Sequence, residues 1–363
     1  MPLIPTRNIA LVATLALSLV VALLFAGHYW SNSPNSSRQQ LLQLIPSDSA
    51  AVAFLDFDGF RQSPFLATIY SWAPHPSEDS EYAQFVRDTG FSYERDLQAA
   101  LVAISSHGTS TNFLAVADGK FDRKKIESFL DRTTGAAVQQ GKLKVFSIND
   151  ASTQVKPVWL AFLSDQRIVI TDAPSLASVL TSVANNAGHA EWESRFERLA
   201  GTPLFVVVRQ DPVLQKALNS AAPGGLRSPQ LSSLLDQLQW ISIAGKPDGE
   251  QLRTVVEGEC LSDLATTQLR DILQGILLLA QNGLNDPKLR RQMNPEQREA
   301  YLEILKGAEV QKIDRGDWKT VRVALSITPK FLDLARAASL TAPTREAPAA
   351  AETPKEKRSP KKN

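Results

Sequence analysis

Two similar stretches of sequence decide the expected fold: residues 112–122, NFLAVADGKFD, and residues 252–262, LRTVVEGECLS. Each starts with alternating apolar residues, a pattern typical of a half-buried strand. Each strand then ends on an acidic residue, Asp118 or Glu257, that is followed by glycine and by a helical segment. The two stretches therefore predict that one strand-to-helix unit occurs twice in the chain.

Two more pairs of segments follow the same order along the chain. Residues 51–58, AVAFLDFD, correspond to residues 202–210, TPLFVVVRQ, because both are short apolar runs that precede a helical segment. Residues 167–180, RIVITDAPSLASVL, correspond to residues 322–335, RVALSITPKFLDLA. Three correspondences in one order predict an internal repeat.

The last pair also predicts where two helices begin. Each of its segments runs from an arginine to a proline, Pro174 or Pro329, which we expect in the first turn of a helix. Proline is tolerated there because its missing N–H would have had no partner. The repeat divides the chain into a first lobe over residues 41–200 and a second lobe over residues 201–341.

The strands of both lobes are expected to pair as hairpins. The expected pairs are 99–106 with 111–118, 158–164 with 167–172, 238–245 with 250–257, and 309–314 with 318–327. Strands grouped as hairpins favour antiparallel sheets covered by helices, and hence the α+β class. The second lobe also carries a helical insert over about 262–306. Its most apolar stretch, residues 271–281, is too short to span a bilayer, so we interpret it as a buried packing helix.

The N-terminus carries the strongest localisation signal. Residues 9–27, IALVATLALSLVVALLFAG, contain no charge and would form a helix of about 28 Å, close to the thickness of the hydrocarbon core. Arg7 precedes this run, so the positive-inside rule places residues 1–8 in the cytoplasm and the rest outside it. This signal-anchor predicts a single-pass protein of the bacterial inner (cytoplasmic) membrane with its bulk in the periplasm. The alternative is a cleaved signal peptide.

Polar segments flank the predicted lobes. Residues 28–40 have the composition of a flexible stalk. Residues 342–363 are rich in proline and lysine, which predicts a disordered tail. The tail is expected either to aid solubility or to bind an anionic lipid or cell-wall polymer.

Composition excludes several function classes. The net charge of +1 disfavours a dedicated nucleic-acid binder, which normally has a basic excess. The single cysteine, Cys260, excludes an intrachain disulfide and a cysteine-based metal site. No phosphate-binding loop or dinucleotide fingerprint is present, so we expect no cofactor and no metal.

One motif invites an enzymatic interpretation. Residues 52–60, VAFLDFDGF, resemble the first motif of haloacid-dehalogenase-type phosphatases, in which two aspartates lie beside Mg²⁺. The resemblance implies that Asp56 would be the nucleophile and Asp58 the general acid/base. Phe60 replaces the family's hydroxyl residue, and the downstream acidic pair is missing. If the pair instead shapes a turn before a helix, it is structural.

The whole layout resembles a family of single-span bacterial envelope proteins with a duplicated α+β extracytoplasmic domain of unknown function. The residues that carry the resemblance are the N-terminal span and the entry segment 44–48, LIPSD. The resemblance implies no catalytic residues. We therefore expect a membrane-anchored, non-catalytic binding or scaffolding protein with an envelope partner. The alternative is a membrane-tethered, metal-dependent hydrolase that uses Asp56 and Asp58.

Overall fold

The computed structural model describes residues 36–70, 80–107, 110–134, 137–148, 157–184, 189–199, 201–211, 237–316 and 318–334. The predicted span, residues 9–27, and the predicted tail, residues 342–363, lie outside these ranges. Within them, no helix combines the length and the apolar character needed to cross a bilayer.

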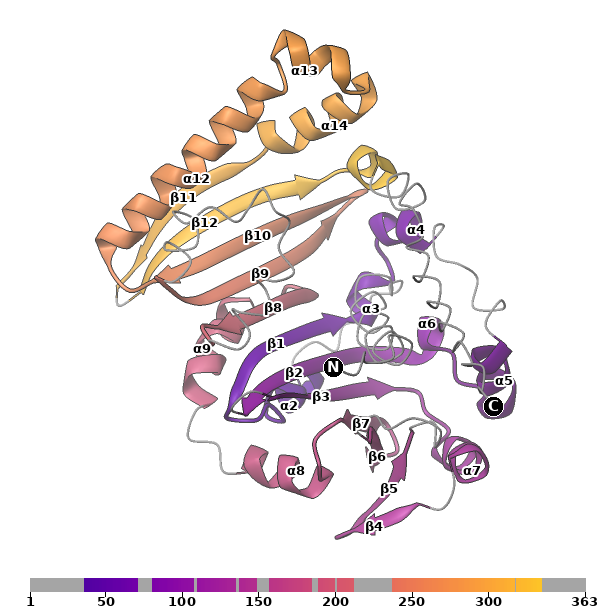
Figure 1. Ribbon diagram of the computed structural model, residues 1–363. Helices are drawn as coiled ribbons and strands as arrows, with labels where there is room; N and C mark the ends of the chain where they lie inside the picture. The colour runs from indigo at the N-terminus through magenta and orange to yellow at the C-terminus, as the bar shows by residue number, and fades with distance from the viewer. Residues whose placement is uncertain are drawn as a thin grey trace, which may run out of the picture.

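The fold is built on one twelve-stranded antiparallel sheet, in the order β11-β12-β10-β9-β8-β1-β2-β3-β7-β6-β5-β4 (Figure 1). The strands are β1 (Ser49–Asp56), β2 (Leu97–His107), β3 (Ser110–Gly119), β4 (Val138–Gln140), β5 (Leu143–Ser147), β6 (Trp159–Ser164), β7 (Arg167–Thr171), β8 (Leu204–Arg209), β9 (Leu238–Asp248), β10 (Gln251–Cys260), β11 (Glu309–Arg315) and β12 (Trp318–Ile327). The α+β class and all four predicted hairpins are confirmed.

The expectation of separate sheets in two lobes is wrong. β1 and β8 pair in antiparallel register, with Phe54 opposite Phe205, and this pairing joins the two halves of the chain into one sheet. The first strand of each half would otherwise leave an edge of unpaired backbone groups, and edge-to-edge pairing satisfies both.

The strand order reads the same outward from this junction in both directions. The first half runs β1-β2-β3-β7-β6, and the second half runs β8-β9-β10-β12-β11. Among the described strands, only the first half continues, with the β4–β5 hairpin that the sequence did not predict. Over these residues the sheet ends on β11 at one edge and on β4 at the other.

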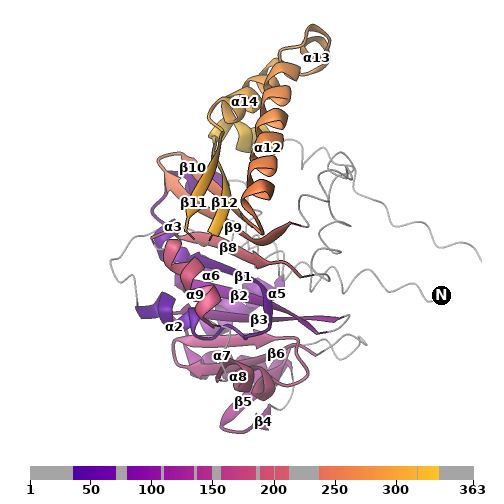
Figure 2. The ribbon, with the colours of Figure 1, turned by 90° about the vertical axis from the view of Figure 1, so that its left-hand side faces the viewer.

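Helices cover both faces of the sheet. The described helices are α2 (Ser36–Leu42), α3 (Phe57–Phe60), α4 (Pro64–Tyr70), α5 (Ser80–Thr89), α6 (Tyr93–Asp96), α7 (Arg123–Thr133), α8 (Leu176–Ala184), α9 (His189–Arg198), α12 (Asp263–Gly283), α13 (Pro287–Gln292) and α14 (Pro295–Lys306). The last three account for the predicted helical insert. Viewed from the side, α13 lies at one pole and β4 at the other (Figure 2).

Neighbouring residues of β1 show how the two faces differ. Phe54 points into the core under α2, α8 and α9, which we call the first face. Leu55 points to the opposite side, called the second face, where it packs with residues of α3 and α4. Successive strand residues point to opposite faces, so β1 contributes to both cores. α7 and α12 also cover the second face, over β5–β6 and β10–β12 respectively.

The two prolines of the repeat differ in position. Pro329 opens the helix over residues 329–334, as predicted. The expectation for Pro174 is wrong, because α8 begins at Leu176 and the proline lies in the bend before it. The backbone turns after β7 over a longer connection than in the second half, so the helix starts later.

Candidate functional site

Asp56 is the last residue of β1 and the N-cap of α3. Its carboxylate Oδ1 accepts a hydrogen bond from the Gly59 backbone N–H at 2.8 Å. A Cβ at Gly59 would lie 2.9 Å from Asp56 Oδ2, so a larger residue at this position would force the carboxylate to shift. Burial raises the pKa of Asp56, and the Gly59 N–H partly opposes this shift. The pKa of Asp56 is therefore higher in the folded state than in the unfolded state. As the pH rises from the unfolded-state pKa to the folded-state pKa, ionisation of Asp56 lowers the free energy of unfolding.

Asp58 lies inside α3 and has a different partner. Its carboxylate accepts a hydrogen bond from Arg61 Nη1 at 2.6 Å, and the Arg61 side chain is 8 % exposed. Arg61 also donates to the Leu97 carbonyl. Burial raises the pKa of Asp58, while the charge of Arg61 lowers it. β1 ends at Asp56, so the two aspartates do not lie on the same strand.

The D-x-D-G motif is explained by a helix cap and an ion pair. Among the residues that the structure describes, no three His, Cys, Asp or Glu side chains lie close enough to hold a metal ion. The geometry of Asp56 and Asp58 thus supplies structural roles for both residues of the phosphatase-like motif.

We expect the double variant Asp56→Asn, Asp58→Asn to remain folded and its melting temperature to be unaffected by millimolar Mg²⁺. Asparagine keeps a cap acceptor at position 56, while the buried Arg61 loses its carboxylate, at a cost of about 2–3 kcal/mol. A Mg²⁺ site occupied at 100 times its dissociation constant would stabilise the wild type by about 2.7 kcal/mol. Scanning calorimetry with and without Mg²⁺ makes the comparison. A Mg²⁺-dependent rise in wild type that the variant lacks would favour the hydrolase.

The repeated acidic residues also form ion pairs, at matching places. Asp118 on β3 lies opposite Arg167 on β7 and binds it at 2.6 Å. Glu257 on β10 lies opposite Arg322 on β12 and also binds it at 2.6 Å. These acids and arginines are the residues that the sequence repeat aligned, and each pair joins equivalent strands of its half.

The glycine after each acid lies in a close packing contact. A Cβ at Gly119 would lie 2.8 Å from the Phe121 ring, and one at Gly258 would lie 2.8 Å from Leu238 Cδ2. These approaches are closer than Cβ atoms tolerate. The acid–Gly pair therefore marks the same structural position twice, an ion pair to the neighbouring strand beside a close contact.

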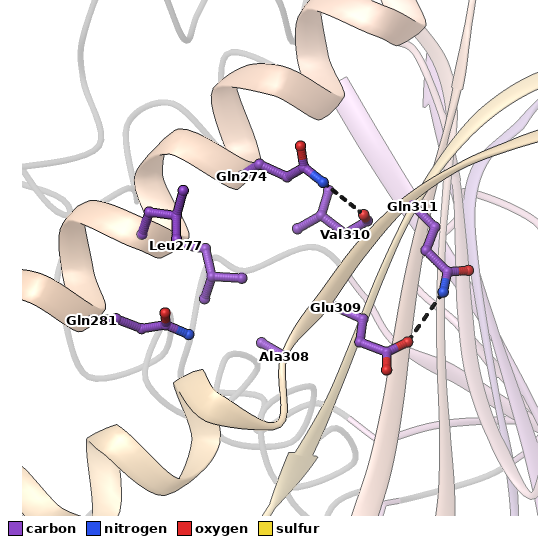
Figure 3. Close-up of a pocket in the computed structure, with 8 residues that line it drawn as sticks. Gln274, Leu277, Gln281, Ala308, Glu309, Val310 and Gln311 are labelled. Carbon is purple, nitrogen blue, oxygen red and sulfur yellow. Dashed lines mark hydrogen bonds between the residues drawn. The ribbon is translucent and has the colours of Figure 1, made fainter.

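A groove of about 530 Å³ lies between α12 and the edge strand β11 (Figure 3). Its lining residues, from both elements and the turn before β11, are Gln274, Leu277, Leu278, Gln281, Ala308, Glu309, Val310 and Gln311. Gln281 is held by a 2.7 Å hydrogen bond from Nε2 to the Leu305 carbonyl. The α12 wall carries the leucines and the amide groups of Gln274 and Gln281, and on β11 Gln311 Nε2 donates to the Glu309 carboxylate at 3.1 Å.

The wall formed by β11 is a free edge of the sheet. The Val310 carbonyl accepts a hydrogen bond from Gln274 Nε2 at 3.4 Å, so it points away from β12. Backbone groups of an antiparallel strand alternate between its two sides. Lys312 and Asp314 therefore direct their backbone groups the same way as Val310. Within the described ranges, β11 pairs with β12 alone.

The sequence did not identify this groove. Residues 271–281 were expected to be buried, but Ile276, Leu278 and Leu279 are 48 %, 58 % and 73 % exposed. α12 packs on the sheet through another side that includes Ala265 and Leu269. The sequence did contain a signal for this exposed surface, because apolar residues occur all around the helix. A helix that packs on one side only needs apolar residues on that side only.

Comparisons with known proteins add a distant likeness. No protein-family model and no curated protein matches the chain. Three solved crystal forms of TP0453 are similar in structure. Form I is 10% identical with a TM-score of 0.44, over 86% of this chain and 99% of that one. Form III is 9% identical with a TM-score of 0.43, over 82% and 97%. Form IV is 11% identical with a TM-score of 0.44, over 81% and 95%.

Proposed function

We propose that this protein is a non-catalytic binding or scaffolding protein of the bacterial cell envelope, anchored by residues 9–27 in the inner membrane with its bulk in the periplasm. The observation that carries the binding role is the groove between α12 and β11. It places Leu277 and the exposed Leu278 beside backbone groups that have no strand partner among the described residues. An exposed edge strand is a template for pairing with another chain, and exposed apolar surface beside it is typical of an interaction site.

The anchor is supported by sequence alone. Residues 9–27 are uncharged and long enough to span a bilayer, and the positive charge precedes them. The lysine-rich tail over residues 342–363 supplies a second contact, to anionic lipid or cell-wall polymer.

We also propose that the two halves are copies of one unit. The shared strand order and the matched ion pairs Asp118–Arg167 and Glu257–Arg322 support this. A copied unit would keep the acid–Gly step because its glycine lies in a close packing contact.

Thiol labelling in whole cells tests location and binding together. The native Cys260 is buried and 7 % exposed, so Leu278→Cys and Leu279→Cys each add one reactive thiol. Leu278 lines the groove and Leu279 does not. We expect a membrane-impermeant maleimide to label both variants in spheroplasts. Position 278 should react more slowly in native membranes than in purified protein, because a partner covers it.

The two positions separate the possible failures. Labelling that requires cell lysis would place the groove in the cytoplasm and contradict the proposed location. Equal rates for Leu278→Cys in membranes and in purified protein would contradict a partner in the groove. Protection of position 279 alone would assign the contact to the other side of α12.

A further inference from the structure

We propose that the groove between α12 and β11 binds an extended segment of a partner protein, which adds to the sheet as an antiparallel strand beside β11. This inference rests on the binding role proposed above and names the form of the partner. The other half of the molecule shows what such a strand looks like.

β6 is the counterpart of β11 in the shared strand order. The aligned arginines set the register: Arg167 corresponds to Arg322, so Ile168 corresponds to Val323. Phe162 of β6 lies opposite Ile168, and Val310 of β11 lies opposite Val323. Phe162 and Val310 therefore occupy equivalent places on the second face.

In the first half, the edge of β6 is occupied by β5. Val145 pairs with Ala161, and Phe146 pairs with Leu160. By the register above, the β6 residues Ala161 and Leu160 correspond to Glu309 and Ala308 of the second half, which line the groove. The empty groove of the second half thus lies where the first half holds its added strand.

The covering helices are also equivalent, because α7 follows β3 and α12 follows β10. The Phe146 side chain of β5 is fully buried and packs with Ile126 and Leu130 of α7. Leu277 and Leu278 of α12 line the corresponding groove without such a side chain between them and β11. A bound strand is expected to place one large apolar side chain there.

The alternation of side chains sets the pattern of the partner segment. Phe146 and Lys144 of β5 point to the second face, where Lys144 binds Glu127 and Asp131 of α7. Glu309 corresponds instead to Ala161, which packs in the core of the first face, and its carboxylate accepts a 3.1 Å hydrogen bond from Gln311 Nε2. We infer that the partner segment alternates apolar and polar residues and directs its apolar anchor toward α12.

The β5 sequence itself is the probe. A fluorescent peptide of residues 141–148, GKLKVFSI, should bind saturably to the full chain in nanodiscs, as measured by fluorescence anisotropy. The same peptide with Phe146→Asp should bind about tenfold more weakly or not at all, because its anchor would bury a charge. Absence of saturable binding would overturn strand addition.

Two pairs of protein variants test the geometry. Val310→Pro removes an outward N–H while leaving the pairing with β12, a position where proline is tolerated on an edge strand. Val310→Ala keeps the N–H. Leu278→Asp charges the groove, and Leu279→Asp charges the neighbouring residue outside it. We expect affinity to fall about tenfold or more for Val310→Pro and Leu278→Asp, and to stay within about twofold for their controls.

The outcomes are distinct. Equal affinity across the four variants would overturn the proposal. Loss in Leu279→Asp with retention in Leu278→Asp would also overturn it and point to a lipid surface on the outer side of α12. If Leu278→Cys is protected in native membranes but the peptide does not bind, a partner remains while strand addition is wrong.

Discussion

Replacing Glu259 with glutamine should lower the free energy of unfolding by about 3–5 kcal/mol. The Glu259 and Arg195 side chains are 2 % and 1 % exposed and lie 2.5 Å apart. Arg198 donates to the other carboxylate oxygen. The neutral amide would leave two arginines without their carboxylate, one of them fully buried. Burial already lowers the pKa of Arg195, which shows how poorly this site solvates a charge.

The Arg195 guanidinium cannot move to water. It lies 3.8 Å from the centre of the Trp240 ring and 4.5 Å from that of Trp318, and its Nη1 donates to the Glu191 carbonyl at 2.6 Å. This sandwich links α9 of the first half to β9 and β12 of the second. We therefore expect the loss in Glu259→Gln to appear as global destabilisation in guanidinium titrations followed by tryptophan fluorescence.

Glu257→Gln on the same strand is the matched control. Its partner Arg322 is 33 % exposed and can be hydrated after the substitution. The control should cost about 1–2 kcal/mol. A loss in Glu259→Gln no larger than that of the control would mean that the Arg195 site admits water.

Truncating Phe205 to alanine should cost about 3–5 kcal/mol, the usual range for a buried aromatic residue. The side chain is fully buried at the junction of β1 and β8. Its ring centre lies 5.2 Å from those of Phe54 and Phe196, and the Arg38 guanidinium lies 4.8 Å from it. A cavity at this place would loosen the contact between the two halves.

Unfolding of Phe205→Ala should nevertheless remain a single transition, because the backbone pairing of β1 and β8 stays intact. Coincidence of the circular dichroism and fluorescence curves makes the test. Val206→Ala is the control, since its half-buried side chain points to the second face, and it should cost about 1 kcal/mol. Two separated transitions in wild type would show that the halves fold independently.

The sequence predicted the strands well where alternating apolar residues were followed by residues that favour a tight turn. The hairpin of β9 and β10 closes at Gly249, and that of β11 and β12 closes at Gly316, both with positive φ. Glycine adopts that conformation without strain, so these turns were visible in the sequence. β4 and β5 were missed because β4 has three residues and its pattern is too short to detect.

The candidate site was less predictable. Asp56 and Asp58 were recognised as a motif, yet their roles depend on where β1 ends and α3 begins. A shift of this boundary by one residue would change both roles. The groove escaped detection because its residues come from α12 and β11, which are separated along the chain by α13 and α14. A local sequence pattern does not show which side of α12 stays exposed beside the edge of the sheet.

The sequence by itself determined the α+β class, the four hairpins and the acid–glycine steps, because these follow from side-chain periodicity and from backbone conformations that few residues adopt. Only the tertiary structure decided that β1 and β8 join the halves into one sheet, that Glu259 meets Arg195, and that β11 is left as an edge beside α12. These outcomes depend on contacts between residues far apart in the chain. The partner of each residue is selected by the total apolar surface that becomes buried, and local conformational preference does not select it.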